Sequence, residues 1–278
     1  MLNVSYCGRV GSFSHEAAVK MFPSAEYTSC DTFIEAVNLV KQDITQYAVI
    51  PIENSTAGRV AEIHNILPTL NLKINKEKIL KITHNLYVLN SNITLNDIKF
   101  VESHPQALMQ CSNFLDTIPV VRENALNTAI AAEDLVKYHK DTTAAICSKT
   151  AGEFYKLHLL KGEIQNMEDN HTTFIAVGKT ENVGQSFTNP LTSIIFTLTN
   201  KTGGIYEALG CFARNNINLL KLESYIPAGI NTKHAQFLLI FQGCNKNNNV
   251  NIALSELTEI ANEVKNLGSY EADLKRFL

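Results

Sequence analysis

The sequence predicts an α/β protein followed by a smaller domain of the ferredoxin-like βαββαβ type. Over the first 178 residues, short apolar segments alternate with segments of helical periodicity, which is typical of α/β folds with mainly parallel sheets. Residues 179–190 are polar and aperiodic, and after them the expected order of elements becomes β-α-β-β-α-β. The periodicity alone leaves open whether the first region holds one sheet or two.

Apolar patterning and capping residues locate the elements of the first region. Ser14, Asp31, Ser103 and Ser148 each stand at the start of an expected helix and are its predicted N-cap. The expected strands are residues 3–7, 47–52, 81–89, 100–102, 119–121, 144–146 and 173–178. The expected helices are residues 15–22, 33–40, 58–67, 105–115, 128–138 and 149–155.

The second region begins after a predicted linker at 179–190, which contains Gly184, Ser186 and Pro190. Its expected strands are residues 192–198, 217–226, 235–241 and 269–274, and its expected helices are 205–214 and 252–264. The asparagine-rich stretch 245–251 is expected to be a solvated loop.

Composition excludes several classes of partner. The chain has 278 residues, 45% of them hydrophobic, which is enough for the cores of two domains. Its net charge is −3 and it has no basic block, so we expect neither nucleic acid nor a membrane as the main partner. No apolar run approaches the roughly 18 residues that cross a bilayer, and residues 1–14 do not resemble a signal peptide. We therefore expect a cytoplasmic protein whose six scattered cysteines are reduced.

Five polar segments stand where strands meet helices or where a strand begins. Open α/β sheets bind ligands at the carboxyl ends of their strands, and these segments supply mainly neutral hydrogen-bond donors, which suit a small ligand that bears carboxylates. Taken singly, each segment also fits an ordinary turn or helix start. Known phosphate-loop, dinucleotide and serine-nucleophile motifs are missing from the sequence, and no histidine pair has metal-ligand spacing, so neither a cofactor nor a metal is expected. The five segments are 8–14, 51–55, 103–106, 124–128 and 169–174.

The same segments resemble the motif series of the prephenate dehydratase family, in its order and at its spacing. The motifs are GRVGSFSHEAA at 8–18, PIENSTAGRV at 51–60, HNL at 84–86, SHPQAL at 103–108 and NHTTF at 170–174. Residues 192–272 resemble the ACT domain that follows in this family, including Gly203-Gly204-Ile205-Tyr206 and Leu222-Glu223-Ser224.

The resemblance implies a fold and a reaction. Residues 1–178 would form a bilobed catalytic domain similar to type II periplasmic binding proteins, with lobe one at about 1–80 plus 173–178 and lobe two at about 81–172. The linker at 179–190 and an ACT domain at 191–278 would follow. The implied reaction converts prephenate into phenylpyruvate, water and carbon dioxide, a lyase step of phenylalanine biosynthesis that needs no cofactor.

The resemblance also implies roles for individual residues. Thr172 matches the family's catalytic threonine, the proposed acid toward the leaving hydroxyl. The ACT domain of the family pairs between subunits and binds the inhibitor phenylalanine, so a homodimer or homotetramer is expected. The implied substrate-binding residues are Ser12, Phe13, Ser14, Asn54, Ser55, Gln106, Thr173 and Phe174, and the implied phenylalanine-binding residues are Gly203, Gly204, Ile205, Glu223 and Ser224.

Two departures from the family pattern leave questions open. The family's Thr-Arg-Phe is Thr-Thr-Phe here, with Thr173 in place of the arginine. We hypothesise that Arg9 or Arg59 supplies the lost positive charge. The family's Glu-Ser-Arg-Pro is Glu-Ser-Tyr-Ile at 223–226, which leaves regulation by phenylalanine open.

Three alternatives to the leading interpretation remain at this point. The enzyme could take arogenate, the aminated analogue of prephenate. It could be a prephenate decarboxylase, which uses the same scaffold without aromatising the ring. It could also be an amino-acid sensor without catalysis.

Overall fold

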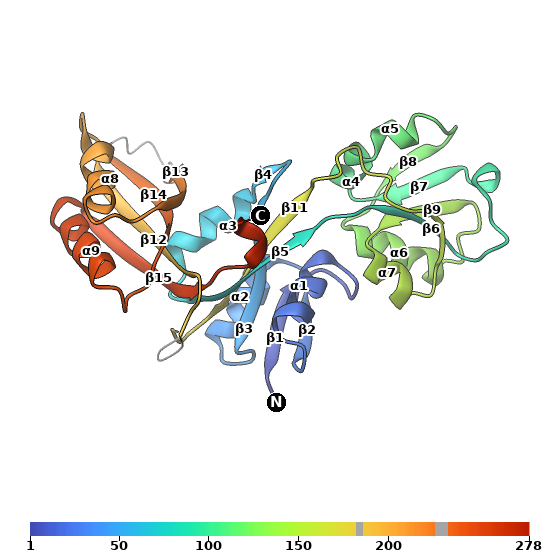
Figure 1. Cartoon of the computed structure of the whole chain (residues 1–278). Helices are drawn as coiled ribbons and strands as arrows, with labels where there is room; N and C mark the ends of the chain where they lie inside the picture. Colours follow the sequence, from blue (N-terminus) through green and yellow to red (C-terminus); the bar gives the residue numbers. More distant parts are fainter. Residues whose placement is uncertain (182–185, 226–232, 278) are drawn as a thin grey trace. The chain divides into compact units, whose positions relative to one another are not determined.

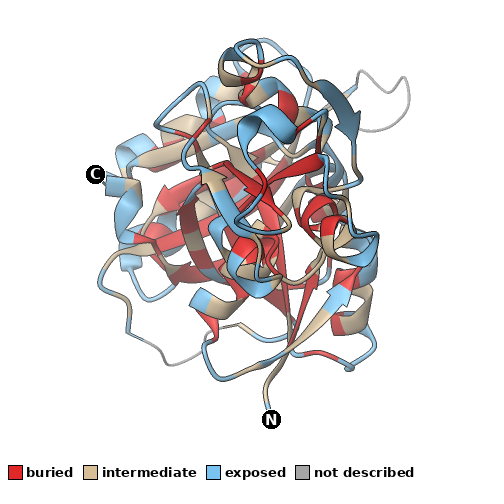
Figure 2. Cartoon of the chain, turned by 90° about the vertical axis from the view of Figure 1, so that its right-hand side faces the viewer, coloured by how far each residue is buried: buried red, intermediate tan, exposed pale blue. Residues whose placement is uncertain are grey.

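The computed structural model describes residues 1–181, 186–225 and 233–277. Its strands form three sheets (Figure 1). Figure 2 shows that buried residues concentrate on the strands of these sheets. The α/β class, with two sheets formed by strands up to residue 178, is confirmed. Within the described ranges, no helix combines the length and the apolar character that crossing a membrane requires.

The first sheet has the strand order β2-β1-β3-β11-β5, and the short β4 pairs with β3. The central β1 is parallel to both β2 and β3, and its Val4 and Tyr6 are buried. Helices α1 and α2 pack on this sheet. The strands are β1 (Asn3–Cys7), β2 (Glu26–Cys30), β3 (Tyr47–Asn54), β4 (Gly58–Arg59), β5 (Lys73–Lys81) and β11 (His171–Gly178), and the helices are α1 (Phe13–Met21), α2 (Phe33–Lys41), α3 (Ala61–Ile66) and the 3-10 turn η1 (Leu67–Thr69).

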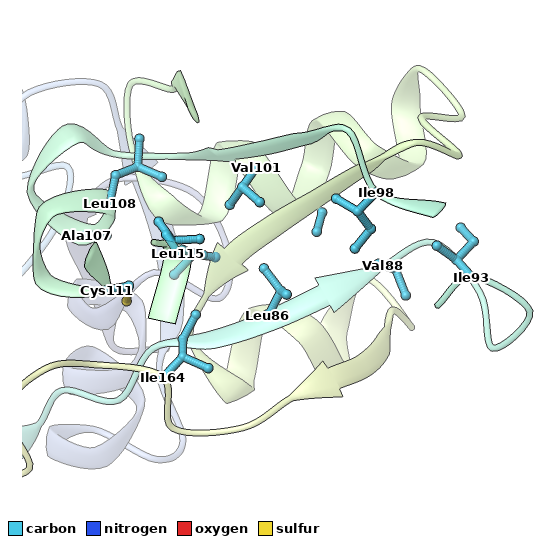
Figure 3. Packing of buried hydrophobic residues seen from close by; sticks show 12 residues of the cluster. Leu86, Val88, Ile93, Ile98, Val101, Ala107, Leu108, Cys111, Leu115 and Ile164 are labelled. Carbon is cyan, nitrogen blue, oxygen red and sulfur yellow. The ribbon is translucent and has the colours of Figure 1, made fainter. Parts of the chain in front are cut away.

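The second sheet has the order β10-β6-β9-β7-β8. Strand β7 is parallel to β8 and β9, whereas β6 is antiparallel to β9 and β10. Figure 3 shows its buried cluster, in which Leu86, Val101 and Leu108 come from β6, β7 and α4. The elements are β6 (Asn85–Val88), η2 (Leu95–Asp97), β7 (Phe100–Ser103), α4 (Pro105–Gln110), α5 (Ser112–Leu115), β8 (Val121–Asn124), α6 (Thr128–Lys137), β9 (Thr143–Cys147), α7 (Lys149–Phe154) and β10 (His158–Lys161).

The third sheet is antiparallel and has the order β13-β14-β12-β15. Its helices α8 and α9 pack against each other, and their apolar residues share a core with the strands. The order of elements is βαββαβ, as predicted. The elements are β12 (Pro190–Thr199), α8 (Gly204–Arg214), β13 (Leu219–Tyr225), β14 (His234–Gln242), α9 (Asn248–Ile260), β15 (Glu263–Glu271) and η3 (Leu274–Phe277).

The chain forms two compact units. Unit 1 consists of Met1–Ile63 and Lys78–Phe174, and unit 2 of His64–Glu77 and Ile175–Leu278. Strands β5 and β11 therefore each run from one unit into the other. Residues 64–77 and 175–178, which were expected in lobe one, lie in unit 2. The lobe and domain boundaries stay predictions.

Contacts within unit 2 attach the segment before β5 and the start of β5 to β15. The Lys73 ammonium donates to the Asn266 carbonyl (2.7 Å), and the Lys265 ammonium donates to the Pro68 carbonyl (2.8 Å). Gly268 has a φ of +113°, and a Cβ there would lie 2.9 Å from the Ile74 carbonyl oxygen. Only glycine fits this close approach without displacing the backbone.

Three of the four predicted helix caps are wrong by one or two residues. Ser12, not Ser14, caps α1 by accepting from the His15 N–H. Thr32, not Asp31, caps α2. His104, not Ser103, caps α4, because the Ser103 hydroxyl donates instead to the carbonyl of Ile146 on the neighbouring strand. Each helix start offers adjacent polar side chains, and local sequence does not decide between them. The fourth cap, Ser148, is confirmed.

Several element boundaries also differ from prediction. The lysine-rich β5 and the edge strand β10 were not predicted, because charged residues obscure their alternation. Residues 58–67 hold β4 and the short α3 rather than one helix, and residues 105–115 divide at Cys111 into α4 and α5.

The bounds of three other elements are shifted along the chain. Strand β8 lies at 121–124 rather than 119–121. The polar stretch 245–251 is not wholly a loop, since α9 begins at Asn248, and β15 occupies 263–271 rather than 269–274. Ile226, in the predicted strand 217–226, and residues 182–185 of the predicted linker lie outside the described residues.

Candidate active site

Unit 1 contains a cavity of about 860 Å³ between elements of the first and the second sheet. Its wall includes the loops that follow β1 and β7, the end of β3 and the start of β11. Most of the residues predicted to bind substrate meet here. Arg9, Ser12, Phe13, Ser14, Asn54, Gln106, Thr172 and Phe174 line the cavity, whereas Ser55, Arg59 and Thr173 do not.

Thr172 is the second residue of β11 and is 8% exposed. Its hydroxyl oxygen accepts a hydrogen bond from Nδ2 of Asn54 (2.9 Å), which lies at the end of β3. Because this bond uses a lone pair of the oxygen, the hydroxyl hydrogen of Thr172 is left to donate to a ligand.

The side-chain amide of Asn54 is held in one orientation by the turn that follows β3. Its Oδ1 accepts from the backbone N–H groups of Thr56 (3.1 Å) and Ala57 (2.9 Å) and from the Thr56 hydroxyl (2.7 Å). Its Nδ2 donates on the other side, to Thr172 and to Oδ1 of Asn170 (2.7 Å). The Asn-Ser-Thr sequence therefore fixes which atom of the amide meets Thr172.

The hydrogen-bond network continues to Gln110 at the end of α4. Nε2 of Gln110 donates to the Thr56 hydroxyl (3.0 Å), and its Oε1 accepts from Nδ2 of Asn170 (3.4 Å). Gln106 is predicted from the sequence as a substrate-binding residue, whereas Gln110 is not. The available signal was the spacing of four residues, which places both glutamines on one face of the helix; both side chains line the cavity.

His84 is buried at the cavity wall, with 3% of its surface exposed. Its Nε2 lies 2.9 Å from Oε1 of Gln110, which accepts a hydrogen bond and thereby places the imidazole proton on Nε2. Burial lowers the pKa of His84, which outweighs the opposite effect of the Gln110 hydrogen bond, so the ring is neutral at pH 7. Its Nδ1 is buried and has no partner among the described residues.

Arg9 lines the cavity, but its guanidinium is engaged by two carboxylates. Nη1 lies 2.9 Å from Oδ1 of Asp31, and Nε lies 3.8 Å from Oε2 of Glu133. Arg59 is exposed on β4 and is not part of the wall. The hypothesis that one of these arginines replaces the family's missing cation stays a prediction; Arg9 has the position for it, and its charge is already paired.

Ser55, Thr173 and Phe174 surround Thr172 in different ways. The Ser55 hydroxyl accepts from the His171 N–H (2.9 Å) and the Ser55 N–H donates to the His171 carbonyl (2.8 Å), which fixes the start of β11. Thr173 points to the opposite side of the strand from its neighbours, since side chains alternate along a strand. Phe174 is 2% exposed and contributes an apolar surface to the cavity.

The candidate phenylalanine-binding residues lie in unit 2. Gly203 has a φ of +81° and is the N-cap of α8, followed by Gly204 and the half-buried Ile205. The Glu223 carboxylate lies 3.1 Å from the Lys221 ammonium, and Ser224 is exposed. Across the described part of the chain, no three His, Cys, Asp or Glu side chains group as metal ligands.

Comparison with known proteins gives a consistent result. A family model described as prephenate dehydratase matches residues 4–182. A chloroplastic protein of Arabidopsis thaliana, named arogenate dehydratase/prephenate dehydratase 2, is 33% identical over 280 residues, which cover 98% of this chain and 73% of the relative.

Two solved structures share the fold over nearly the whole chain. The prephenate dehydratase of Arthrobacter aurescens in complex with L-Phe has a TM-score of 0.88 and 27% identity, with 98% of this chain and 90% of that chain covered. A protein called GqqA, described as a novel type of quorum quenching acylase, has a TM-score of 0.90 and 28% identity, with 99% of both chains covered.

Proposed function

The chain belongs to the prephenate dehydratase family, and we propose that it converts prephenate into phenylpyruvate, water and carbon dioxide. The observation that carries the proposal is the Thr172 hydroxyl, which lines the cavity with its oxygen bonded to Asn54 and its hydrogen free for a ligand.

The substrate supplies the driving force, because the ring becomes aromatic. The bond to the ring carboxylate breaks and releases carbon dioxide, its electron pair moves into the ring, and the bond to the ring hydroxyl breaks. The leaving oxygen takes the proton of Thr172 as that bond breaks and departs as water. Solvent then returns a proton to the threonine oxygen.

Asn54 makes this proton transfer easier. A threonine hydroxyl is a weak acid at neutral pH, and its oxygen gains negative charge as the proton leaves. The Asn54 amide already donates to that oxygen (2.9 Å), and a donor aimed at developing charge in a buried site lowers the barrier. Asn170, Gln110 and Thr56 hold the Asn54 amide in this orientation.

The test is an assay with prephenate, in which phenylpyruvate is read from its ultraviolet band in alkali. T172A should lower kcat by about 10² to 10⁴, the range for loss of a general acid. T172S keeps the hydroxyl and is the matched control, with kcat near that of the wild type. The melting temperature of both variants should stay close to that of the wild type.

Each other outcome identifies an alternative. Carbon dioxide without the phenylpyruvate band would indicate a prephenate decarboxylase, and no turnover would indicate a sensor without catalysis. Full activity of T172A would contradict the role of Thr172.

We also propose that phenylalanine regulates the enzyme through an ACT domain in unit 2, at Gly203, Gly204, Ile205, Glu223 and Ser224. Support comes from the βαββαβ order and from the L-Phe complex of the Arthrobacter relative. Inhibition by phenylalanine that G203V abolishes would agree with this site. We further propose that the protein forms a homodimer or homotetramer through this domain. We also propose a cytoplasmic location, which is consistent with its six unpaired cysteines.

Arogenate is a second candidate substrate, because acidic side chains line the cavity. It has the ring of prephenate with an ammonium group in place of the keto oxygen of the side chain. The name of the Arabidopsis relative includes both substrates.

A further inference from the structure

The loop after β1 and the start of α1 form a large part of the cavity wall. Residues 12–14, all of them predicted to bind substrate, line the cavity. The beginning of the loop is held within the first sheet, because the Gly8 N–H donates to the Cys30 carbonyl (2.9 Å) at the end of β2. The position of the wall residues therefore depends on what holds the middle of the loop, at Gly11.

Both backbone polar groups of Gly11 have partners. Its N–H donates to Nδ1 of His15 (3.3 Å) in the first turn of α1, and its carbonyl accepts from the hydroxyl of Ser148 (2.6 Å). Ser148 follows β9, so this second bond joins a loop of the first sheet to an element of the second. Ser148 is 1% exposed, and a hydrogen bond shielded from water in this way is electrostatically stronger than an exposed one.

The two backbones approach closely at this point. Gly11 has a φ of +86°, and a Cβ there would lie 2.5 Å from Cα of Ala151 in the first turn of α7. Any side chain would displace the loop or the helix, so glycine is what allows the loop to reach Ser148. A further contact beside it joins the Thr150 hydroxyl to Oε2 of Glu16 (3.2 Å).

Helix α7 gives the Ser148 hydroxyl a fixed position and direction. The Ser148 oxygen also accepts from the Ala151 N–H (3.0 Å) as the N-cap of α7, which leaves the hydroxyl hydrogen to donate to Gly11. The helix is packed on the second sheet, because Gly152 lies against the Tyr87 ring with no room for a Cβ, and Ala151 and Tyr87 share a buried cluster. The donor thus stands on a rigid element, whereas its acceptor stands on a loop.

We propose that Ser148 is a positioning residue for substrate binding, which holds residues 8–14 in the arrangement that the substrate meets. The inference rests on the proposed function, because it assumes that this loop binds the substrate of the dehydration. Ser148 is not among the described residues that line the cavity, so it acts through Gly11.

The position of Ser148 separates its effect on binding from any effect on the chemical step. Without the Ser148 donor, the loop would have to be ordered as the substrate binds, and this cost would weaken binding. Thr172 and Asn54 lie on β11 and β3, so the proton transfer should be unaffected.

The experiment measures KM and kcat with prephenate in the full-length S148A and S148G variants. Both remove the hydroxyl, but glycine is nearly as good an N-cap as serine, whereas alanine is not. We expect both variants to raise KM roughly 3- to 10-fold, the range for the net contribution of one hydrogen bond. The value of kcat should stay within about twofold of the wild type, the pattern for an interaction made equally in the ground state and the transition state. The melting temperature should fall more in S148A than in S148G.

S5A is the matched control. Ser5 on β1 is fully buried, and its hydroxyl donates to the Ala36 carbonyl (2.7 Å) on α2, a bond of the same kind that stays beside the first sheet. Ser5 does not line the cavity. The variant should lower the melting temperature and leave KM unchanged.

Hydrogen–deuterium exchange measured by mass spectrometry tests the same inference without turnover. Residues 8–14 should exchange faster in S148A and S148G than in the wild type and in S5A. This measurement reports on the loop whichever substrate the enzyme takes.

Three outcomes would overturn the inference and leave the dehydratase function in place. A rise in KM in S148A that S148G lacks would assign the effect to the helix cap. Unchanged KM and exchange in both variants would show that the loop keeps its place without Ser148. A fall in kcat at constant KM would show that Ser148 does not act on binding. A wild type that does not turn over prephenate would instead overturn the proposed function, and the exchange measurement would still decide whether Ser148 holds the loop.

Discussion

In unit 1 the buried polar side chains of the cavity are uncharged, whereas unit 2 buries an ion pair. The Asn54 amide donates to Thr172, and Asn170 and Gln110 extend this network with further neutral amides. In unit 2, Nη2 and Nε of Arg276 donate to both carboxylate oxygens of Glu77, at 2.5 and 2.9 Å, and the Glu77 side chain is 0% exposed.

The difference shows two uses of a buried polar group. A neutral amide can exchange one hydrogen-bond partner for another at small cost, so a network of amides can accept a ligand. A buried charge that loses its partner costs far more, so the ion pair fixes η3 and β5 together. The amide network therefore suits a ligand-binding site, and the buried ion pair suits a permanent contact between η3 and β5.

The largest expected effect is the loss of stability on removal of the buried ion pair. R276A leaves Glu77 buried without its partner and should destabilise the protein by about 3–5 kcal/mol, measured by urea unfolding. K275A, at the exposed neighbour in η3, should change stability by less than about 0.5 kcal/mol. Similar losses in the two variants would show that the ion pair is not what attaches η3.

The next largest expected effect is on kcat, and it separates the two hydrogen-bonding roles of Asn54, which are acceptance from the turn and donation to Thr172. N54D keeps the oxygen that accepts from Thr56 and Ala57 but loses the donor to Thr172. We expect kcat to fall about 10²- to 10³-fold, as for loss of a donor to developing charge. An unchanged melting temperature would show that the turn persists, and an unchanged kcat would contradict the role of the amide.

A smaller effect compares the two glutamines of α4. Q110L removes a hydrogen-bond partner of His84, Thr56 and Asn170, and we expect kcat to fall about tenfold, the effect of one hydrogen bond of about 1 kcal/mol and its disturbed neighbours. Q106L changes a residue of the same wall outside this network and should act mainly on KM. Equal effects of the two substitutions on kcat would contradict a separate role for Gln110 in the hydrogen-bond network.

The smallest expected effect is a dependence of stability on pH that arises from three histidines of unit 1. Burial lowers the pKa values of His15, His84 and His104, all in unit 1, from the ordinary value of 6.5. Between the lowered and the ordinary pKa, the unfolded chain binds more protons, so stability is complete above about pH 6.5 and is lost as the pH falls.

The melting temperature should therefore be lower at pH 5.5 than at pH 7.5, by about 2–4 °C for each kcal/mol lost. Differential scanning calorimetry gives the measurement, and H84Q should reduce the difference between the two pH values. A difference that H84Q leaves intact would assign the effect to the other two histidines.

Much of the site follows from the sequence, because its residues stand at strand ends. Thr172 and Asn54 occupy motif positions, and the fold brings these residues within hydrogen-bond distance although 118 positions separate them. Gln110 was missed because it stands outside the short motif, at the far end of the helix. Asp31 was expected as a helix cap and instead lines the cavity, because the adjacent Thr32 takes the cap.

The order of elements in the C-terminal region also follows from local alternation, whereas the composition of unit 2 does not. The segment 64–77 joins residues 175–278 through lysine–carbonyl hydrogen bonds, the close approach at Gly268 and the Glu77–Arg276 pair. These contacts connect residues almost 200 positions apart, and neither periodicity nor composition reports such pairing.

The membership of residues 64–77 in unit 2 limits how the gene can be divided. A polypeptide ended after residue 178 would leave Glu77 without Arg276 and Ile74 without Gly268. If the C-terminal half were exchanged for that of a relative, residues 64–77 would pack against a surface that differs from their own. Engineers who wish to transplant one half should therefore redesign residues 64–77 along with it, and homologous recombination should favour crossovers that keep both pieces from one parent.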